Sequence, residues 1–157
     1  MRAHLGYVRT LGESGKRSIA REEYARRAAQ PGALEVDRVL AERLASDQSS
    51  SALRSIYDHA AAREPASPWW PLGLAEIELA EADAWKGARE TAREAGDREG
   101  QTDADRQARA ALMRADHALD RVDALGSLPH EAAIYRGYVR AVDGRLGHQV
   151  VVVEDDH

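Results

Sequence analysis

The chain has 157 residues, which is the size of one domain or of a compact array of short repeats. It contains no cysteine, so the sequence excludes a disulfide framework, a Cys-ligated zinc, an iron–sulfur cluster and a catalytic thiol. The formal net charge is −5, but residues 1–31 carry seven basic and three acidic side chains, so a basic N-terminal segment precedes an acidic remainder.

The first half of the chain predicts three helices separated by turn residues. Ser18 is the expected N-cap of a helix over about 19–29, and Pro31-Gly32 ends it. The next helix covers about 33–45, where apolar residues recur every four positions. After a polar loop over 47–51, the spacing typical of an amphipathic helix is shown by Leu53, Ile56, Tyr57, Ala60 and Ala61.

The second half predicts longer helices. A helical pattern covers about 69–95, either as one helix or as two helices with a break near 83–87. The segment 96–103 has the composition of a solvated loop. Two further helices are expected over about 104–125, with a stripe of Leu and Val, and over about 130–143.

Composition and segment order together predict an all-α fold of antiparallel helical hairpins. Alanine accounts for 30 residues and Phe is absent, which favours thin layers of closely packed helices. We expect a flexible basic segment over 1–17 and a single helical domain over 18–147. The tail 148–157 contains four consecutive valines, and because β-branched residues favour extended backbone, we expect it to be extended or disordered.

Two segments align without gaps at an offset of 64 residues. The matched pairs are Pro65 with Pro129, Gly73 with Gly137, and Ala60 with Ala124. Around the first proline the pattern is Tyr57-x2-Ala60-x4-Pro65, and Trp69-x2-Leu72-Gly73 follows. This pattern resembles the tetratricopeptide repeat, in which an aromatic residue, a small residue and a proline end one helix and the next opens with an aromatic residue followed by Leu-Gly.

The resemblance covers about residues 50–146 and has departures. The loop from Pro65 to Trp69 is about two residues shorter than in the family, Glu76 stands where the family prefers Tyr, and Arg121 replaces the aromatic residue in the second segment. The resemblance implies a short solenoid of stacked hairpins that binds proteins without catalysis. A generic alanine-rich helical bundle is the alternative.

The sequence offers no set of residues for catalysis or for a cofactor. It contains no HExxH metal motif and no Gly-x-Ser-x-Gly nucleophile elbow, and the Gly12–Ser18 segment lacks the glycine spacing of a phosphate-binding loop. We therefore expect neither an enzyme nor a bound cofactor or metal. No apolar run is long enough to cross a membrane and the N-terminus has no signal-like core, so a cytoplasmic protein is expected.

The predicted function is protein–protein interaction, through a peptide or helix of a partner or through self-association. Helix geometry selects six candidate contact residues: Trp70, Glu76, Asp83, Tyr135, Arg136 and Arg140. Trp69 and Trp70 point about 100° apart on a helix, so one is expected in the core and the other either in a binding groove or capping the loop near Pro68 and Pro71. Core positions for both are favoured over these, because the chain has few large side chains to fill its interior. Nucleic-acid binding by the basic N-terminal helices is a second hypothesis, and Glu22 and Glu23 argue against it.

Overall fold

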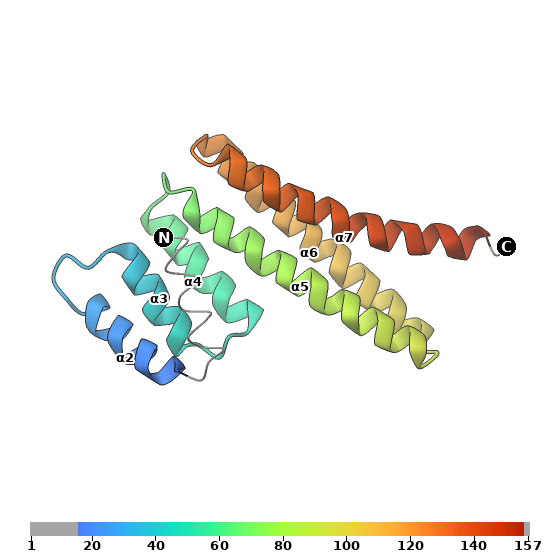
Figure 1. Cartoon of the computed structure of the whole chain (residues 1–157), viewed down its shortest axis with the longest axis horizontal. Coiled ribbons are helices and arrows are strands. Elements are labelled where there is room, and N and C mark those ends of the chain that lie inside the picture. The colour runs from blue at the N-terminus through green and yellow to red at the C-terminus, as the bar shows by residue number, and fades with distance from the viewer. Residues whose placement is uncertain (1–15, 156–157) are drawn as a thin grey trace. The chain divides into compact units, whose positions relative to one another are not determined.

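The computed structural model describes the backbone of residues 16–155 and the side chains of residues 16–144. Within these residues the chain forms six α-helices, α2 to α7, and no strand, which confirms the all-α prediction (Figure 1). The chain divides into two compact units between Trp70 and Pro71. The single helical domain expected over 18–147 stays a prediction. The predicted flexible segment 1–17 lies outside the described residues except for its last two positions.

The first unit contains α2 (Arg17–Ala28), α3 (Glu35–Ala45) and α4 (Ser50–Arg63). One face of α2 packs against α3 through a cluster of buried side chains: Ala20, Tyr24, Leu40 and Leu44. The side chains at positions 20 and 24, and those at 40 and 44, are four residues apart and therefore lie on one face of each helix. The apolar periodicity of the sequence thus places the core of this unit correctly.

The helix ends in the first unit show which of the predicted capping and turn residues lie at a helix boundary. α2 begins before the predicted cap, with Lys16 at its N-cap position, and Ser18 lies inside its first turn. α2 ends at Ala28, just before the predicted stop at Pro31-Gly32. In the turn that follows, Gly32 has a φ of +75° that other residues rarely adopt. At α4 the Ser49 side chain accepts a hydrogen bond from the Ala52 backbone N–H at 3.1 Å, as a serine N-cap should.

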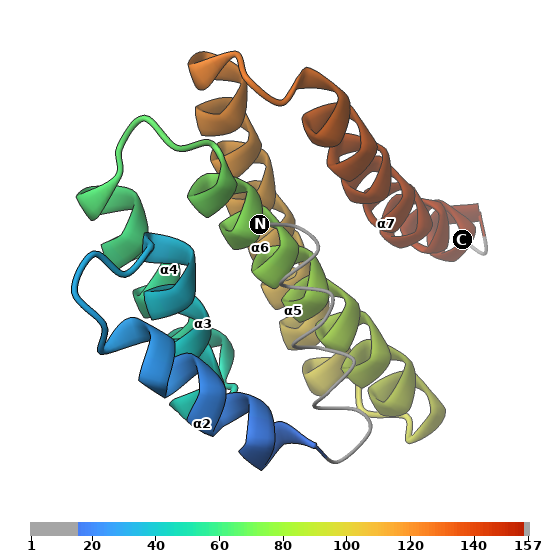
Figure 2. The same ribbon diagram turned by 60° about the vertical axis from the view of Figure 1, so that its left-hand side comes forward.

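The second unit contains most of α5 (Trp69–Glu94), together with α6 (Arg98–Leu125) and α7 (Pro129–Asp155). α5 and α6 lie side by side and run antiparallel, and α7 lies against α6 (Figures 1 and 2). α5 is one continuous helix, which decides between the two alternatives for 83–87. Gly126 ends α6 in the left-handed conformation at φ +69°, and Pro129 starts α7, where its missing N–H costs no hydrogen bond.

One prediction about a loop in this unit is wrong. The segment 96–103 is not a loop, because α6 already begins at Arg98. Its composition is loop-like, but the Asp97 side chain accepts a hydrogen bond from the Gly100 backbone N–H at 2.9 Å and so starts the helix six residues early.

The tail 148–157, expected to be extended or disordered, has helical backbone as far as Asp155, because α7 continues to that residue. A valine costs only roughly 0.5 kcal/mol relative to alanine in a helix, and a helix that already exists extends without a new nucleation step. Residues 156 and 157 lie outside the described part of the chain.

The tetratricopeptide resemblance stays a prediction. The helices of the α5–α6 hairpin have 26 and 28 residues, which is longer than a hairpin repeat of about 34 residues can hold. The aligned positions also differ in their surroundings. Ala60 and Gly73 are buried, whereas Ala124 and Gly137 are exposed, and a Cβ added at Gly137 would meet no atom within 4 Å.

Candidate interaction groove

A groove with a volume of about 490 Å³ is lined by side chains of α6 and α7. Leu112 and Val139, which are 4% and 6% exposed, supply its apolar floor, while Met113 beside them is 74% exposed. The remaining lining residues are charged: Arg109, Asp116, Arg136, Arg140 and Asp143. We call this set of eight residues the α6–α7 groove.

The two helices place these side chains through their amphipathic patterns. The predicted stripe of α6 is buried as expected, at Leu112, Ala115, Leu119 and Val122. Arg109 and Asp116 lie three or four residues from Leu112, so they flank this stripe on the helix surface. On α7 the buried Val139 is flanked in the same way by Arg136 and Asp143, so an apolar floor acquires a charged rim from both helices.

Arg136 of α7 joins the two helices through three carboxylates of α6. Its guanidinium lies 3.0 Å from Asp116, 2.7 Å from Asp120 and 2.6 Å from Asp123. The hydrogen bonds that Arg136 donates to Asp123 and then to Asp120 raise the pKa of Arg136 above its ordinary value, so this charge is permanent. Because the three aspartates lie on successive turns of α6, one side chain of α7 contacts two turns of its neighbour.

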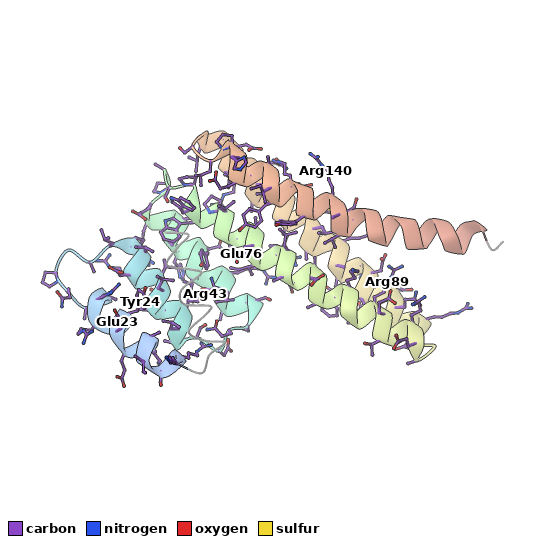
Figure 3. All side chains as sticks on the ribbon, viewed as in Figure 1. Glu23, Tyr24, Arg43, Glu76, Arg89 and Arg140 are labelled. Atoms are coloured by element: carbon purple, nitrogen blue, oxygen red, sulfur yellow. The ribbon has the colours of Figure 1, made fainter. Side chains whose placement is uncertain are left out.

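A second arginine, Arg109, is also neutralised within the unit. Its Nε donates a hydrogen bond to Asp105 at 3.1 Å, and its Nη1 lies 3.5 Å from Asp143 across the groove. Arg140 differs from both, because it is exposed and makes no ion pair with any of residues 16–144. In Figure 3 the Arg140 side chain projects away from α7.

The structure brings together only part of the predicted contact set. Arg136 and Arg140 line the α6–α7 groove. Tyr135 is half-buried on α7 and forms an edge-to-face pair with Tyr138, with ring centroids 6.0 Å apart, but it does not line the groove. Glu76 and Asp83 lie on α5, half-buried and exposed respectively, and neither lines the groove.

Trp70 does not fit the role of an exposed contact. Its side chain is only 2% exposed, its ring lies 6.1 Å from that of Tyr57, and its Nε1 donates a hydrogen bond to Glu64 at 2.9 Å. Trp69 is half-buried, so neither tryptophan is an open groove residue. The core alternative describes this pair better, because a chain without Phe has few large rings to fill its interior.

The residues that the sequence analysis missed are the groove's own apolar and acidic members. Met113 follows directly after the buried Leu112 and lies off the apolar stripe of α6, so an apolar residue at this position was a usable signal. Asp116 and Asp143 carried no such signal, because acidic residues are frequent along both helices. Their role depends on the pairing of α6 with α7, which spacing within one helix does not reveal.

The described part of the chain offers little support for a metal site or for nucleic-acid binding by the basic N-terminal helices. Among these residues no group of three or more His, Asp or Glu side chains could hold a metal ion. In the first unit, two of the basic side chains of α2 are engaged internally. Arg17 donates hydrogen bonds to the carbonyls of Leu44 and Ser46 at the end of α3, and Arg27 pairs with Glu23 at 2.6 Å.

Comparison with known proteins gives no relative for this chain. No family model and no curated protein matches its sequence, and no solved structure matches its fold. No helix within the described residues is long and apolar enough to cross a membrane.

Proposed function

We propose that this protein is a non-enzymatic interaction module whose α6–α7 groove binds a peptide or a helix of a partner protein. The observation that carries the proposal is the exposed Met113 above a buried apolar floor, inside a charged rim. An apolar centre with a polar rim is the usual anatomy of a protein interface. Methionine suits such a centre because its flexible, polarisable side chain adapts to different partners.

The ion pairs around the groove also support binding. Arg136 and Arg109 tie α6 to α7 at four carboxylates in total, Asp116, Asp120 and Asp123 on one side and Asp143 on the other. A wall that is ordered before the partner arrives loses less conformational entropy on binding.

Site-specific photo-crosslinking tests the proposal. A benzophenone amino acid replaces Met113 in one variant of the full chain, and Arg121 in a control variant. Arg121 is exposed on α6 but does not line the groove. After irradiation in the native host, we expect the crosslinker at position 113 to give adducts with a defined protein segment, identified by mass spectrometry, and the control to give none of them. The same adducts at both positions, or no adduct at position 113, would contradict groove binding.

A further inference from the structure

We infer that the α6–α7 groove selects acidic partner segments, in which a carboxylate pairs with Arg140 while a neighbouring apolar side chain packs against Met113. This inference rests on the proposed function and adds the chemistry of the partner. It follows from three features of the groove: which charges are already neutralised, where the remaining charge lies, and where the exposed apolar surface lies.

The charges that line the groove are paired with one exception. Arg109 is paired with Asp105 and Asp143, and Arg136 with Asp116 as well as with two carboxylates outside the groove. Three arginines and two aspartates line the groove, so the lining itself carries a net charge of +1. Arg140 is the lining cation that has no ion pair among residues 16–144.

A partner that covers Arg140 must compensate this charge. Taking an arginine out of water without a counter-charge is costly, and a like charge placed against it is strongly unfavourable. A carboxylate offers the planar, bidentate geometry that a guanidinium fits best. The groove therefore discriminates for Asp or Glu, and against Lys or Arg, at the position that meets Arg140.

The acidic residues nearby do not reverse this preference. Asp116, Asp120 and Asp123 share the single positive charge of Arg136, but Asp120 and Asp123 do not line the groove and lie seven and ten residues beyond Met113 on α6, roughly 10–15 Å along the helix. At that separation solvent and salt screen their charges. Inside the groove, the exposed Met113 above Leu112 and Val139 offers apolar contact area. The partner segment is thus expected to carry an aliphatic side chain close to its carboxylate, an arrangement that an amphipathic acidic helix provides.

Selection from a display library of random peptides tests the inference with the full-length protein. Wild type, Arg140→Glu and Arg121→Glu serve as targets, and the last is the matched control because it makes the same charge change at an exposed α6 residue outside the groove. Peptides enriched on wild type are synthesised and their dissociation constants measured by fluorescence anisotropy. Circular dichroism melts verify that the variants remain folded.

We expect enrichment of Asp or Glu next to Leu, Ile or Met on wild type. The affinity of these peptides should fall roughly tenfold or more with Arg140→Glu and remain unchanged with Arg121→Glu. Peptides in which Lys replaces the acidic residue should recover binding to Arg140→Glu.

Two results would overturn the inference while leaving groove binding intact. One is enrichment of peptides without an acidic preference, and the other is an equal effect of the two charge reversals. Concentration-dependent dimerisation of the wild type that Arg140→Glu abolishes would identify a second copy as the occupant, and would also overturn it. Enriched peptides are also tested for binding to Met113→Asp. If no enriched peptide loses affinity for this variant, the result counts against the proposed function itself.

Discussion

The indole of Trp70 contacts two side chains of the first unit. It packs against Tyr57, whose hydroxyl accepts a hydrogen bond from Arg43 at 2.9 Å, and its own N–H is bonded to Glu64. A buried aromatic pair of this kind contributes through apolar area and through ring geometry together. We therefore expect Trp70 to stabilise the fold, so its substitution should change the free energy of unfolding.

We predict that Trp70→Ala lowers the free energy of unfolding by about 3–5 kcal/mol, because it leaves a large cavity beside Tyr57. Trp70→Phe keeps most of the volume and should cost less than about 2 kcal/mol, since Glu64 is exposed and regains water when the N–H is lost. Urea unfolding followed by circular dichroism measures both changes. Trp69→Ala is the control, and a loss at position 69 as large as at position 70 would contradict the burial difference.

The sequence could not decide between the two tryptophans. Both lie at the start of a helix, and the face that each one occupies depends on where the next elements pack. The burial of residues in the middle of long periodic segments was easier to predict. The stripe on α6 and the cluster at Tyr24 and Leu40 follow from spacing alone, and both are buried as predicted.

At the scale of the helices, two glycines differ in backbone conformation. Gly126 adopts a φ of +69° at the C-terminus of α6, whereas Gly87 lies within α5, where an added Cβ would meet no atom within 4 Å. We predict that Gly126→Ala destabilises the protein by about 1 kcal/mol, because alanine is strained in the left-handed region. Gly87→Ala should stabilise it by about 0.5–1 kcal/mol. Thermal melts of the two single variants should show a lower melting temperature for Gly126→Ala and a higher one for Gly87→Ala. A shift in the same direction for both would contradict the different backbone conformations of the two glycines.

Arg136 of α7 pairs with three aspartates of α6. We predict that Arg136→Met, which keeps the apolar stem and removes the charge, lowers the stability of the hairpin by about 1–2 kcal/mol. The estimate stays modest because the three aspartates are 49–70% exposed and remain hydrated.

Hydrogen exchange of the α7 amides measures the effect of Arg136→Met. Arg140→Met is the matched control, on the same helix and without an ion pair among residues 16–144. Added salt should narrow the difference in α7 exchange rates between Arg136→Met and wild type, since it screens the ion pairs that wild type retains. Equal exchange in the two variants would show that the carboxylates of α6 do not hold α7.

Helix existence was predictable throughout the described chain, and helix ends were predictable only where the local signal was strong. The Pro31-Gly32 pair follows the end of α2 as expected, and Ser49, within the predicted polar loop over 47–51, caps α4. The start of α6 was missed because a loop-like composition hid the capping aspartate at position 97. Of the candidate site, Arg136 and Arg140 were predicted, but their role arises from pairing across two helices, and no pattern within one helix encodes it.

At the scale of the whole molecule, the two units differ in how they bury apolar surface. The largest fully buried side chains of the first unit include Tyr24, Leu40 and Tyr57, whereas alanines provide most of the buried face of α6. An alanine removes much less apolar area from water than a leucine or tyrosine does. Each unit nevertheless has its own buried core, which permits the two to lose structure separately.

Two matched cavity variants test this separation. Leu40 in α3 and Leu119 in α6 are both fully buried, so each leucine-to-alanine change should cost about 2–5 kcal/mol in the unit that contains it. Hydrogen exchange resolved by helix should show that Leu40→Ala lowers protection in α2 to α4 more than in α6 and α7, and that Leu119→Ala does the reverse. A uniform loss of protection in both variants would mean that the chain unfolds as one cooperative body. In that case the groove between α6 and α7 would depend on the core of the first unit, and a mutation at Leu40 would weaken partner binding as much as one at Leu119.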